Sequence, residues 1–146
     1  MEYVLVLFPL LGSVISGFFG KKLGVRTCQL LTSSFVSISA ILSLFIFYQV
    51  FATDYSSNKL IFNWISSGNF HVNWSINIDP LTSVMLVVVS LISSIIHFYS
   101  IGYMSHDPHK TRFMAYLSLF TFAMLTLVTA DNFLQLFFGW EGVGLC

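Results

Sequence analysis

Charged side chains are scarce in this sequence. Of its 146 residues, 8% are Asp, Glu, Lys or Arg, whereas soluble domains carry about 25%. These are too few charges to cover the surface of a water-soluble globule of this length. Hydrophobic residues make up 56% of the chain, and the mean hydropathy is +0.84. The composition therefore excludes an ordinary soluble domain and predicts a membrane protein.

Cysteine, net charge and catalytic motifs are also lacking. The two cysteines, Cys28 and Cys146, are far apart and fit neither a disulfide framework nor a zinc site. Six basic residues balance six acidic ones, which argues against nucleic acid as a partner because phosphate binding needs an excess of positive charge. The sequence has no glycine-rich phosphate loop and no pairing of a nucleophile with a base. We therefore expect this chain to bind neither a cofactor nor a metal.

The long apolar runs are typical of transmembrane helices, which need about 20 residues to cross a bilayer. The expected spans are residues 3–19, 30–51, 81–101 and 113–130, with an incomplete span at 133–146. Pro9 is tolerable in the first span because neighbouring helices can satisfy the carbonyl group that a proline leaves free. Asp79-Pro80 provides the usual chemistry of a helix start for the third span. The second span carries serines that suit contact between helices, namely Ser33, Ser34, Ser37, Ser39 and Ser43.

The basic residues gather on one side of this predicted arrangement. Five of the six lie between the first and second spans or between the third and fourth: Lys21, Lys22, Arg26, Lys110 and Arg112. Lys59 falls on the other side, together with acidic residues: Glu2, Asp54, Asp79 and Asp131. The positive-inside rule places the basic side in the cytoplasm or the mitochondrial matrix. The amino terminus then faces outward, and the run from residue 133 enters the membrane from the outside.

Residues 60–78 differ in kind from the apolar spans. Apolar and polar side chains alternate with a period of two from Phe70 to Ile78, and a Gly68-Asn69 turn signal precedes them. We therefore predict a β-hairpin on the outer surface. The predicted fold is an all-α membrane protein with four transmembrane helices and the start of a fifth, plus this hairpin, within one unit covering residues 1–146.

Glu141 is the most informative single residue. It lies in the last apolar run, where a carboxylate near the bilayer centre costs roughly 3 kcal/mol and so usually faces a bundle interior or a hydrated path. At about 1.5 Å per residue, a helix that starts near Asn132 carries Glu141 some 12–14 Å inward, close to the middle of a hydrocarbon layer of about 30 Å. A proton relay needs a titratable group at that depth. The neighbouring Gly139, Gly142 and Gly144 favour close helix packing, with water entry as the alternative.

The last apolar run holds 14 residues, from 133 to 146, and a spanning helix needs about 20. Its last carbonyl groups would lie inside the hydrocarbon unless another segment covered them. We therefore expect the chain to be the first portion of a longer protein, with a separate chain or a further segment completing the fifth helix.

Three stretches together resemble one family. They are Trp74–Met85 at the start of the third span, His97–Pro108 at its end, and Phe137–Cys146. In this order and at these separations they are similar to the amino-terminal part of subunit 5 (the bacterial subunit L), the largest antiporter-like membrane subunit of respiratory complex I. The resemblance covers nearly the whole chain, including the predicted hairpin. It implies a proton-pumping module of NADH:ubiquinone oxidoreductase.

The same resemblance implies a role for Glu141. In the family, the glutamate of the Trp-Glu motif on the fifth helix is a key protonatable residue that works with lysines on later helices, and here it matches Glu141. The resemblance also implies that the chain is part of an enzyme complex but carries out no redox chemistry itself. NADH, FMN, iron–sulfur clusters and ubiquinone are expected in partner subunits. The expected neighbours are other complex I membrane subunits and lipids. The implied location is the mitochondrial inner membrane, with the bacterial plasma membrane as the alternative.

Other interpretations stay open. The large subunit of a multi-subunit cation/proton antiporter shares this helix plan and the glutamate motif, and a structural fragment that helps assembly is a third possibility. Glu141 could form a static ion pair or hydrogen bond instead of transferring protons. His97, near the inner end of the third span, could titrate near neutral pH, but we expect it to be held by a hydrogen bond or to face an interface.

Overall fold

The computed structural model describes residues 1–53 and 55–146, with the backbone alone at Lys21. Asp54, predicted to lie on the outer side, is outside the described residues. Within the described residues, four helices are long and apolar enough to cross a membrane: α1 (Glu2–Leu23), α2 (Val25–Thr53), α3 (Pro80–Tyr103) and α4 (Lys110–Val128). A shorter helix, α5 (Phe133–Leu145), follows α4, and the strands β1 (Ser57–Ser67) and β2 (Phe70–Ile78) connect α2 to α3. The predicted fold class is therefore confirmed.

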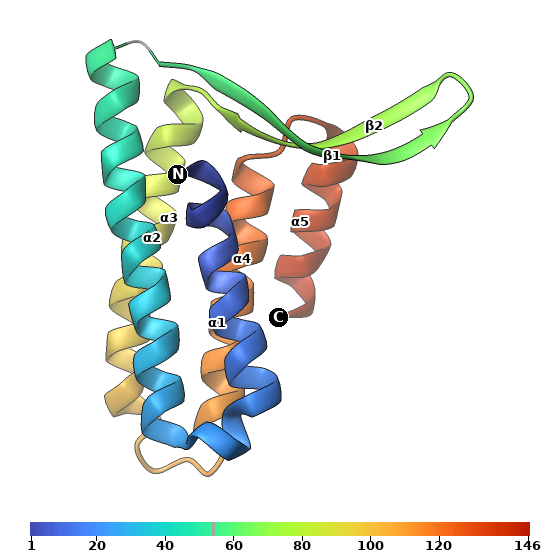
Figure 1. The fold of residues 1–146 in the computed structure, drawn as a ribbon. Helices are drawn as coiled ribbons and strands as arrows, with labels where there is room; N and C mark the ends of the chain where they lie inside the picture. The colour runs from blue at the N-terminus through green and yellow to red at the C-terminus, as the bar shows by residue number, and fades with distance from the viewer. Residues whose placement is uncertain (54) are drawn as a thin grey trace.

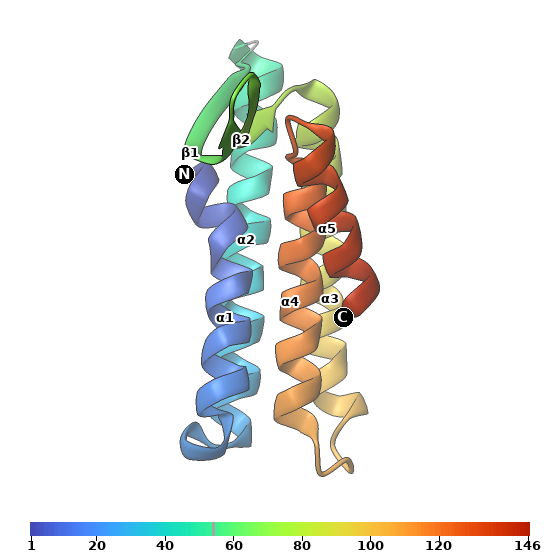
Figure 2. The same cartoon turned by 90° about the vertical axis from the view of Figure 1, so that its right-hand side faces the viewer.

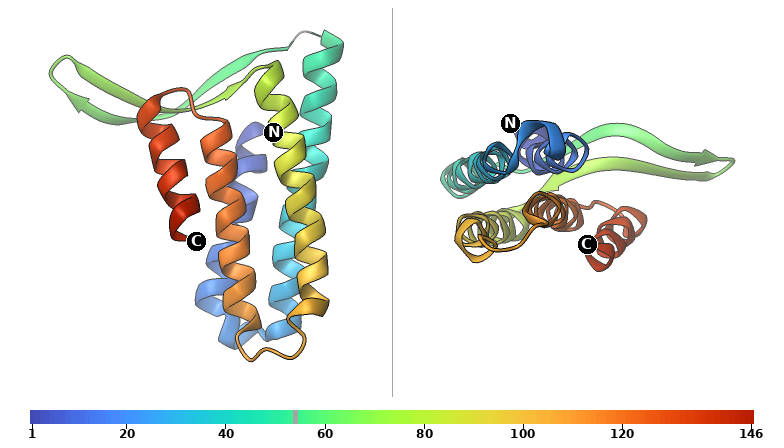
Figure 3. Two further views of the ribbon diagram at one scale, coloured as in Figure 1. Left: turned by 180° about the vertical axis from the view of Figure 1, so that it is seen from behind. Right: turned by 90° about the horizontal axis from the view of Figure 1, so that it is seen from below.

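The helices α1 to α4 form an up-and-down bundle (Figures 1 and 2). Seen along the helix axes, α1 and α2 form one row, α3 and α4 form a second row, and α5 lies outside the bundle against α4 (Figure 3). The short α1–α2 and α3–α4 connections lie at one end of the bundle, and the hairpin and the amino terminus lie at the other. In the predicted orientation the hairpin end is the outer one.

The inner ends of the first two helices differ from the prediction. α1 continues to Leu23 and α2 begins at Val25, instead of ending at 19 and starting at 30. Gly24 alone separates them and adopts a φ of 83°, a left-handed value that glycine reaches without a steric penalty. Because one glycine reverses the chain, no loop is needed, and Lys22 and Arg26 lie on the helix ends.

Pro9 lies inside α1, and its predicted accommodation is confirmed. A proline has no N–H group, so the carbonyl group four residues earlier, that of Leu5, loses its helical partner. Ser39 of α2 donates its hydroxyl proton to Leu5 O at 2.8 Å. Ser118 of α4 donates in the same way to Pro9 O at 2.8 Å. Neighbouring helices thus satisfy the backbone around the proline.

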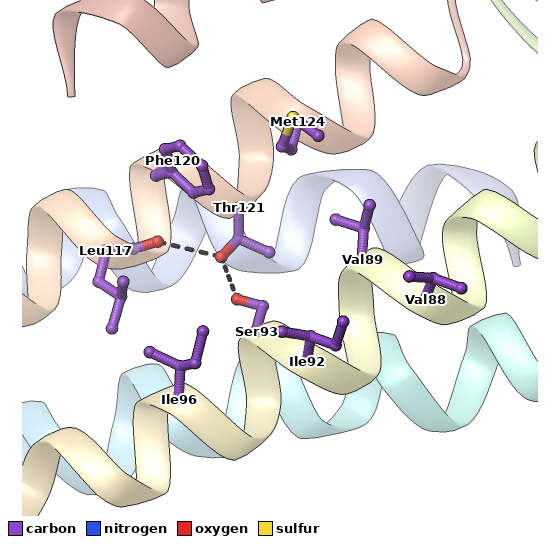
Figure 4. A pocket seen from close by; sticks show the side chains of 9 residues that line it. All are labelled: Val88, Val89, Ile92, Ser93, Ile96, Leu117, Phe120, Thr121 and Met124. Atoms are coloured by element: carbon purple, nitrogen blue, oxygen red, sulfur yellow. Dashed lines mark hydrogen bonds between the residues drawn. The ribbon is translucent and has the colours of Figure 1, made fainter.

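Hydroxyl groups also link α2 to α3 and α3 to α4. Ser37 Oγ lies 3.0 Å from Ser94 Oγ, and Ser43 Oγ lies 2.7 Å from Ser90 Oγ. The predicted role of the α2 serines is therefore confirmed for Ser37, Ser39 and Ser43, whereas Ser34 is exposed. Figure 4 shows the link between α3 and α4, where Ser93 and Thr121 meet among mostly apolar side chains.

The hairpin lies across the outer end of the bundle, and its turn projects past α5 (Figures 1 and 3). β1 and β2 pair antiparallel, with Ser67 opposite Phe70 around the predicted two-residue turn. The strand-paired region begins at Ser57, three residues before the predicted start. Ile76 and Ile78 of β2 are buried in a core cluster with side chains from the bundle helices: Leu5, Val6, Ile46, Val50, Leu86 and Leu125. The end of the hairpin that lies next to α3 is therefore part of the hydrophobic core.

Candidate functional site

The start of α5 is fixed by Asn132. Its Oδ1 atom accepts a hydrogen bond from Gln135 N at 2.9 Å, which makes it the helix N-cap. Its Nδ2 atom donates to Asn73 O of β2 at 2.7 Å. One side chain therefore both begins the helix and attaches it to the hairpin.

Gln135 makes the second attachment of α5 to the hairpin. Its side chain is completely buried. Nε2 donates to Ser75 O at 2.7 Å, and Oε1 accepts from Ser75 N at 3.2 Å. The amide thus satisfies both backbone groups of one β2 residue. Asn77 N donates to Thr129 O at 3.0 Å, so the α4–α5 turn is bound to the same strand.

Glycines set the distance between α5 and α4. A Cβ atom built on Gly139 would lie 2.7 Å from Leu127 Cβ and 2.8 Å from the Leu127 backbone nitrogen. A Cβ atom on Gly142 would lie 3.1 Å from Ala123 Cβ. The predicted close packing is confirmed for these two glycines. Gly144 has open space around it in the described part of the chain.

Aromatic side chains of the hairpin and α5 pack against one another. The rings of Trp64 and Trp74 have centroids 5.0 Å apart, and the Phe138 ring lies 5.0 Å from Trp74 and 6.0 Å from Trp64. All three contacts are edge-on, a favourable geometry for aromatic pairs. Both tryptophans therefore hold α5, in addition to any contact they make with lipid headgroups.

Glu141 lies on a side of α5 that this chain leaves uncovered. It is two residues beyond Gly139, about 200° around the helix axis, and one residue before Gly142, about 100°, so it lies away from the face packed on α4. Its side chain is exposed and has no hydrogen bond or ion pair with the residues that the structure describes. Nine residues separate it from Asn132, or about 13–14 Å along the helix axis. This distance along the helix is the one expected from the sequence.

The other glutamate, Glu2, lies at the outer end of α1 and binds the hairpin. Oε1 accepts hydrogen bonds from Tyr55 OH and Ser57 Oγ, each at 2.9 Å. Lys59 Nζ lies 3.2 Å from Oε2, and Glu2 is only 4% exposed. Hydrogen bonding and attraction to this carboxylate raise the pKa of Lys59 above its ordinary value. We name these four residues the Glu2 clamp.

Neither Gln135 nor the Glu2 clamp was anticipated from the sequence. Both carry local signals, since Gln135 is a polar residue inside an apolar run and Glu2 is a charged residue directly before one. Their partners, however, lie 53 to 60 residues away in the chain. His97, in contrast, is held as expected: Nδ1 lies 2.8 Å from Ser93 O, and the ring is buried.

Fold and site together define a class of protein: a multi-pass membrane protein whose fifth helix carries an acid along an apolar run. Comparison with known proteins gives the family. A family model described as NADH-Ubiquinone oxidoreductase (complex I), chain 5 N-terminus, matches residues 64–114. Beyond these residues, the chain is similar along nearly its whole length to proteins named as chain 5 or subunit L.

Three relatives illustrate the similarity. NADH-ubiquinone oxidoreductase chain 5 of Trichophyton rubrum is 51% identical over 146 residues, which is 100% of this chain and 22% of the relative. The protein of the same name from Arabidopsis thaliana is 56% identical over 144 residues, 98% of this chain and 22% of the relative. NADH-quinone oxidoreductase subunit L of Rickettsia felis is 50% identical over 146 residues, 100% of this chain and 23% of the relative. The chain thus spans about a fifth of the length of these relatives.

Proposed function

We propose that this chain is the amino-terminal part of a membrane subunit of NADH:ubiquinone oxidoreductase and contributes to proton translocation coupled to electron transfer from NADH to ubiquinone. The observation that carries the proposal is similarity over the whole chain to proteins named for that reaction, in mitochondrial and bacterial lineages. The four apolar helices fit a membrane subunit. The mitochondrial inner membrane is the proposed location.

Glu141 is the proposed proton carrier. A carboxylate in apolar surroundings favours the protonated state, and an approaching cation favours the ionised state. A lysine supplied from outside this chain could therefore drive proton uptake and release as it moves, provided that water reaches the carboxylate. Lys22 and Lys110 lie at the inner end of the bundle, opposite the hairpin, and Lys59 is paired with Glu2 in the Glu2 clamp. In this proposal the moving cation comes from another segment or subunit.

The electron-transfer groups belong to partners in this proposal. NADH, FMN, iron–sulfur clusters and ubiquinone would be bound by other subunits, and this chain would act only on protons. Other membrane subunits of the complex are the proposed neighbours, and they or a further segment would cover the Glu141 face of α5.

The test is the Glu141→Gln variant of the assembled enzyme. Glutamine keeps the size and hydrogen-bonding capacity of the side chain but cannot carry a proton, so we expect the number of protons moved per electron pair to fall. The measurement uses membrane vesicles, with proton uptake and NADH oxidation followed together. Asp107→Asn is the control: it removes a carboxyl group from the α3–α4 connection, at the end of the bundle opposite the hairpin, and should leave the ratio unchanged.

An unchanged ratio in Glu141→Gln would contradict the role of this residue. Purification of the native complex tests the wider assignment. Flavin and iron–sulfur subunits should accompany the chain, and their absence from an intact complex would favour the cation/proton antiporter.

A further inference from the structure

His97 has one ring nitrogen that the protein satisfies and one that it does not. Nδ1 lies 2.8 Å from Ser93 O, and a carbonyl oxygen can only accept, so Nδ1 carries the proton. In the neutral ring, Nε2 is then a hydrogen-bond acceptor. The side chain is 0% exposed, and Nε2 has no partner among the described residues.

The nearby hydroxyl of Ser93 does not alter this assignment. Thr121 Oγ1 donates its proton to Leu117 O at 3.0 Å. In the contact between Ser93 and Thr121, therefore, Ser93 must be the donor (Figure 4). The single hydroxyl proton of Ser93 is used there and is not available to the His97 ring.

A second buried group lacks a partner on the facing helix. Ser33 of α2 is 1% exposed, and its Oγ atom has no hydrogen-bond partner among the described residues. Its own carbonyl oxygen accepts from Ser37 Oγ at 2.7 Å, but its hydroxyl group is left over. A serine hydroxyl can both donate and accept.

The helix register brings Ser33 and His97 to the same level of the α2–α3 interface. The antiparallel helices meet at Ser43 with Ser90 and at Ser37 with Ser94. From the second contact, Ser33 lies four residues further inward on α2, or about 6 Å, and His97 lies three residues further inward on α3, or about 4.5 Å. Residues three or four apart share a helix face. Both groups therefore continue the same row of polar contacts.

We propose that His97 Nε2 and Ser33 Oγ bind an internal water molecule between them. Water supplies the O–H donor that Nε2 requires, and its oxygen can accept from the Ser33 hydroxyl. Internal water in proteins typically bridges two to four buried polar groups that lack protein partners. The site continues the Ser43–Ser90 and Ser37–Ser94 contacts toward the inner end of the bundle. It stands independently of the function proposed for Glu141.

A cryo-EM map of the assembled complex, at a resolution that shows ordered water, tests the site. We expect a density peak about 2.7–3.2 Å from both His97 Nε2 and Ser33 Oγ. Two results would overturn the proposal: a direct hydrogen bond between the two side chains, or no peak at this position when other internal waters are resolved.

Two variants separate the site from general packing. Ser33→Ala removes one ligand, and we expect the peak to be lost or to move away from residue 33. Ser83→Ala is the matched control, because Ser83 is also a buried serine but its hydroxyl donates to Pro80 O at 2.8 Å within its own helix. The control should keep the peak. A peak that stays in place in Ser33→Ala would exclude the serine as a ligand and overturn the proposal.

Discussion

The buried carboxylate of Glu2 attaches two elements to each other through two hydrogen bonds and one ion pair. Oε1 accepts hydrogen bonds from two hydroxyl groups, and Oε2, which has no hydrogen bond of ordinary geometry among the described residues, lies 3.2 Å from the Lys59 ammonium group in an ion pair. A buried carboxylate without such partners would be costly. With them, it attaches the first turn of α1 to the start of β1, and the attachment depends on the charge of Lys59.

This dependence predicts a loss of stability at high pH. The pKa of Lys59 is raised above its ordinary value of 10.5 in the folded protein, chiefly by its hydrogen bond and attraction to Glu2. A raised pKa means that the stabilisation is complete below 10.5 and is lost as the pH rises through the higher folded value. We expect the thermal midpoint of the complex to exceed that of Lys59→Gln at pH 8, with the difference closing above pH 10.5. A difference that did not shrink however far the pH was raised above 10.5 would show that the ammonium group is not responsible.

Residue-level features were predictable from the sequence when their partners are close in the chain. Asp79 caps α3 through Thr82 N at 2.6 Å, three residues away, and the Asp-Pro pair indicated it. The need for a donor near Pro9 was predictable as well, because proline chemistry fixes it, although the sequence did not identify Ser39. The hydrogen bonds between Gln135 and the Ser75 backbone were not predictable, because they depend on where the hairpin crosses the bundle.

At the scale of whole elements, the position of α5 depends on Gly139. A methyl group at this position would overlap the Leu127 backbone, which cannot move without displacing α4. We expect Gly139→Ala to destabilise the packing of α5 by about 1–3 kcal/mol, as overpacked sites do. The amount of assembled complex on native gels and its thermal midpoint should both fall.

Gly144→Ala is the control for this substitution. It introduces the same methyl group on the same helix, where no described atom lies within 4 Å. Alanine has a higher helix propensity than glycine by up to about 1 kcal/mol, so the control should be neutral or slightly stabilising. Equal losses in both variants would mean that helix propensity or an outside partner, rather than contact with Leu127, determines the effect.

The existence of the helices and strands was predictable from the length and the period of the apolar pattern, whereas the residues at which they end were not. The apolar runs gave the four spans and the alternation gave the hairpin, since both patterns reflect burial of one face. The inner ends of α1 and α2 extend beyond the apolar runs because Gly24 allows an immediate reversal, so charged residues such as Lys22 and Arg26 remain helical. The distance of Glu141 from the start of α5 was predictable from the sequence, whereas the side of the helix on which it lies depends on the packing of Gly139 against α4.

In the whole molecule, the hairpin connects the first helix to the last. The Glu2 clamp holds β1 at Ser57 and Lys59, and Gln135 holds β2 at Ser75. Lys59 is paired with Ile76 and Leu60 with Ser75, so the two attachments fall on neighbouring rungs of one ladder. The placement of α5, and with it Glu141, should therefore depend on contacts made by the first turn of α1.

A double-variant experiment tests this connection. Gln135→Leu leaves the Ser75 N–H and carbonyl groups without their side-chain partner, at about 1–3 kcal/mol for each buried unpaired group, and Glu2→Gln weakens the clamp. Sites that act independently give additive free energies within about 0.3–0.5 kcal/mol. Both attachments hold the same two strands, so once one attachment is broken the other stabilises the hairpin less. We therefore expect the free energy of hairpin opening to fall less in the double variant than the sum of the losses in the two single variants. Hydrogen exchange of the β2 amides, followed by mass spectrometry in the assembled complex, measures the opening free energy of the unchanged protein, of each single variant and of the double variant. Strict additivity would mean that the hairpin does not couple α1 to α5, and the position of Glu141 would then be independent of the Glu2 clamp.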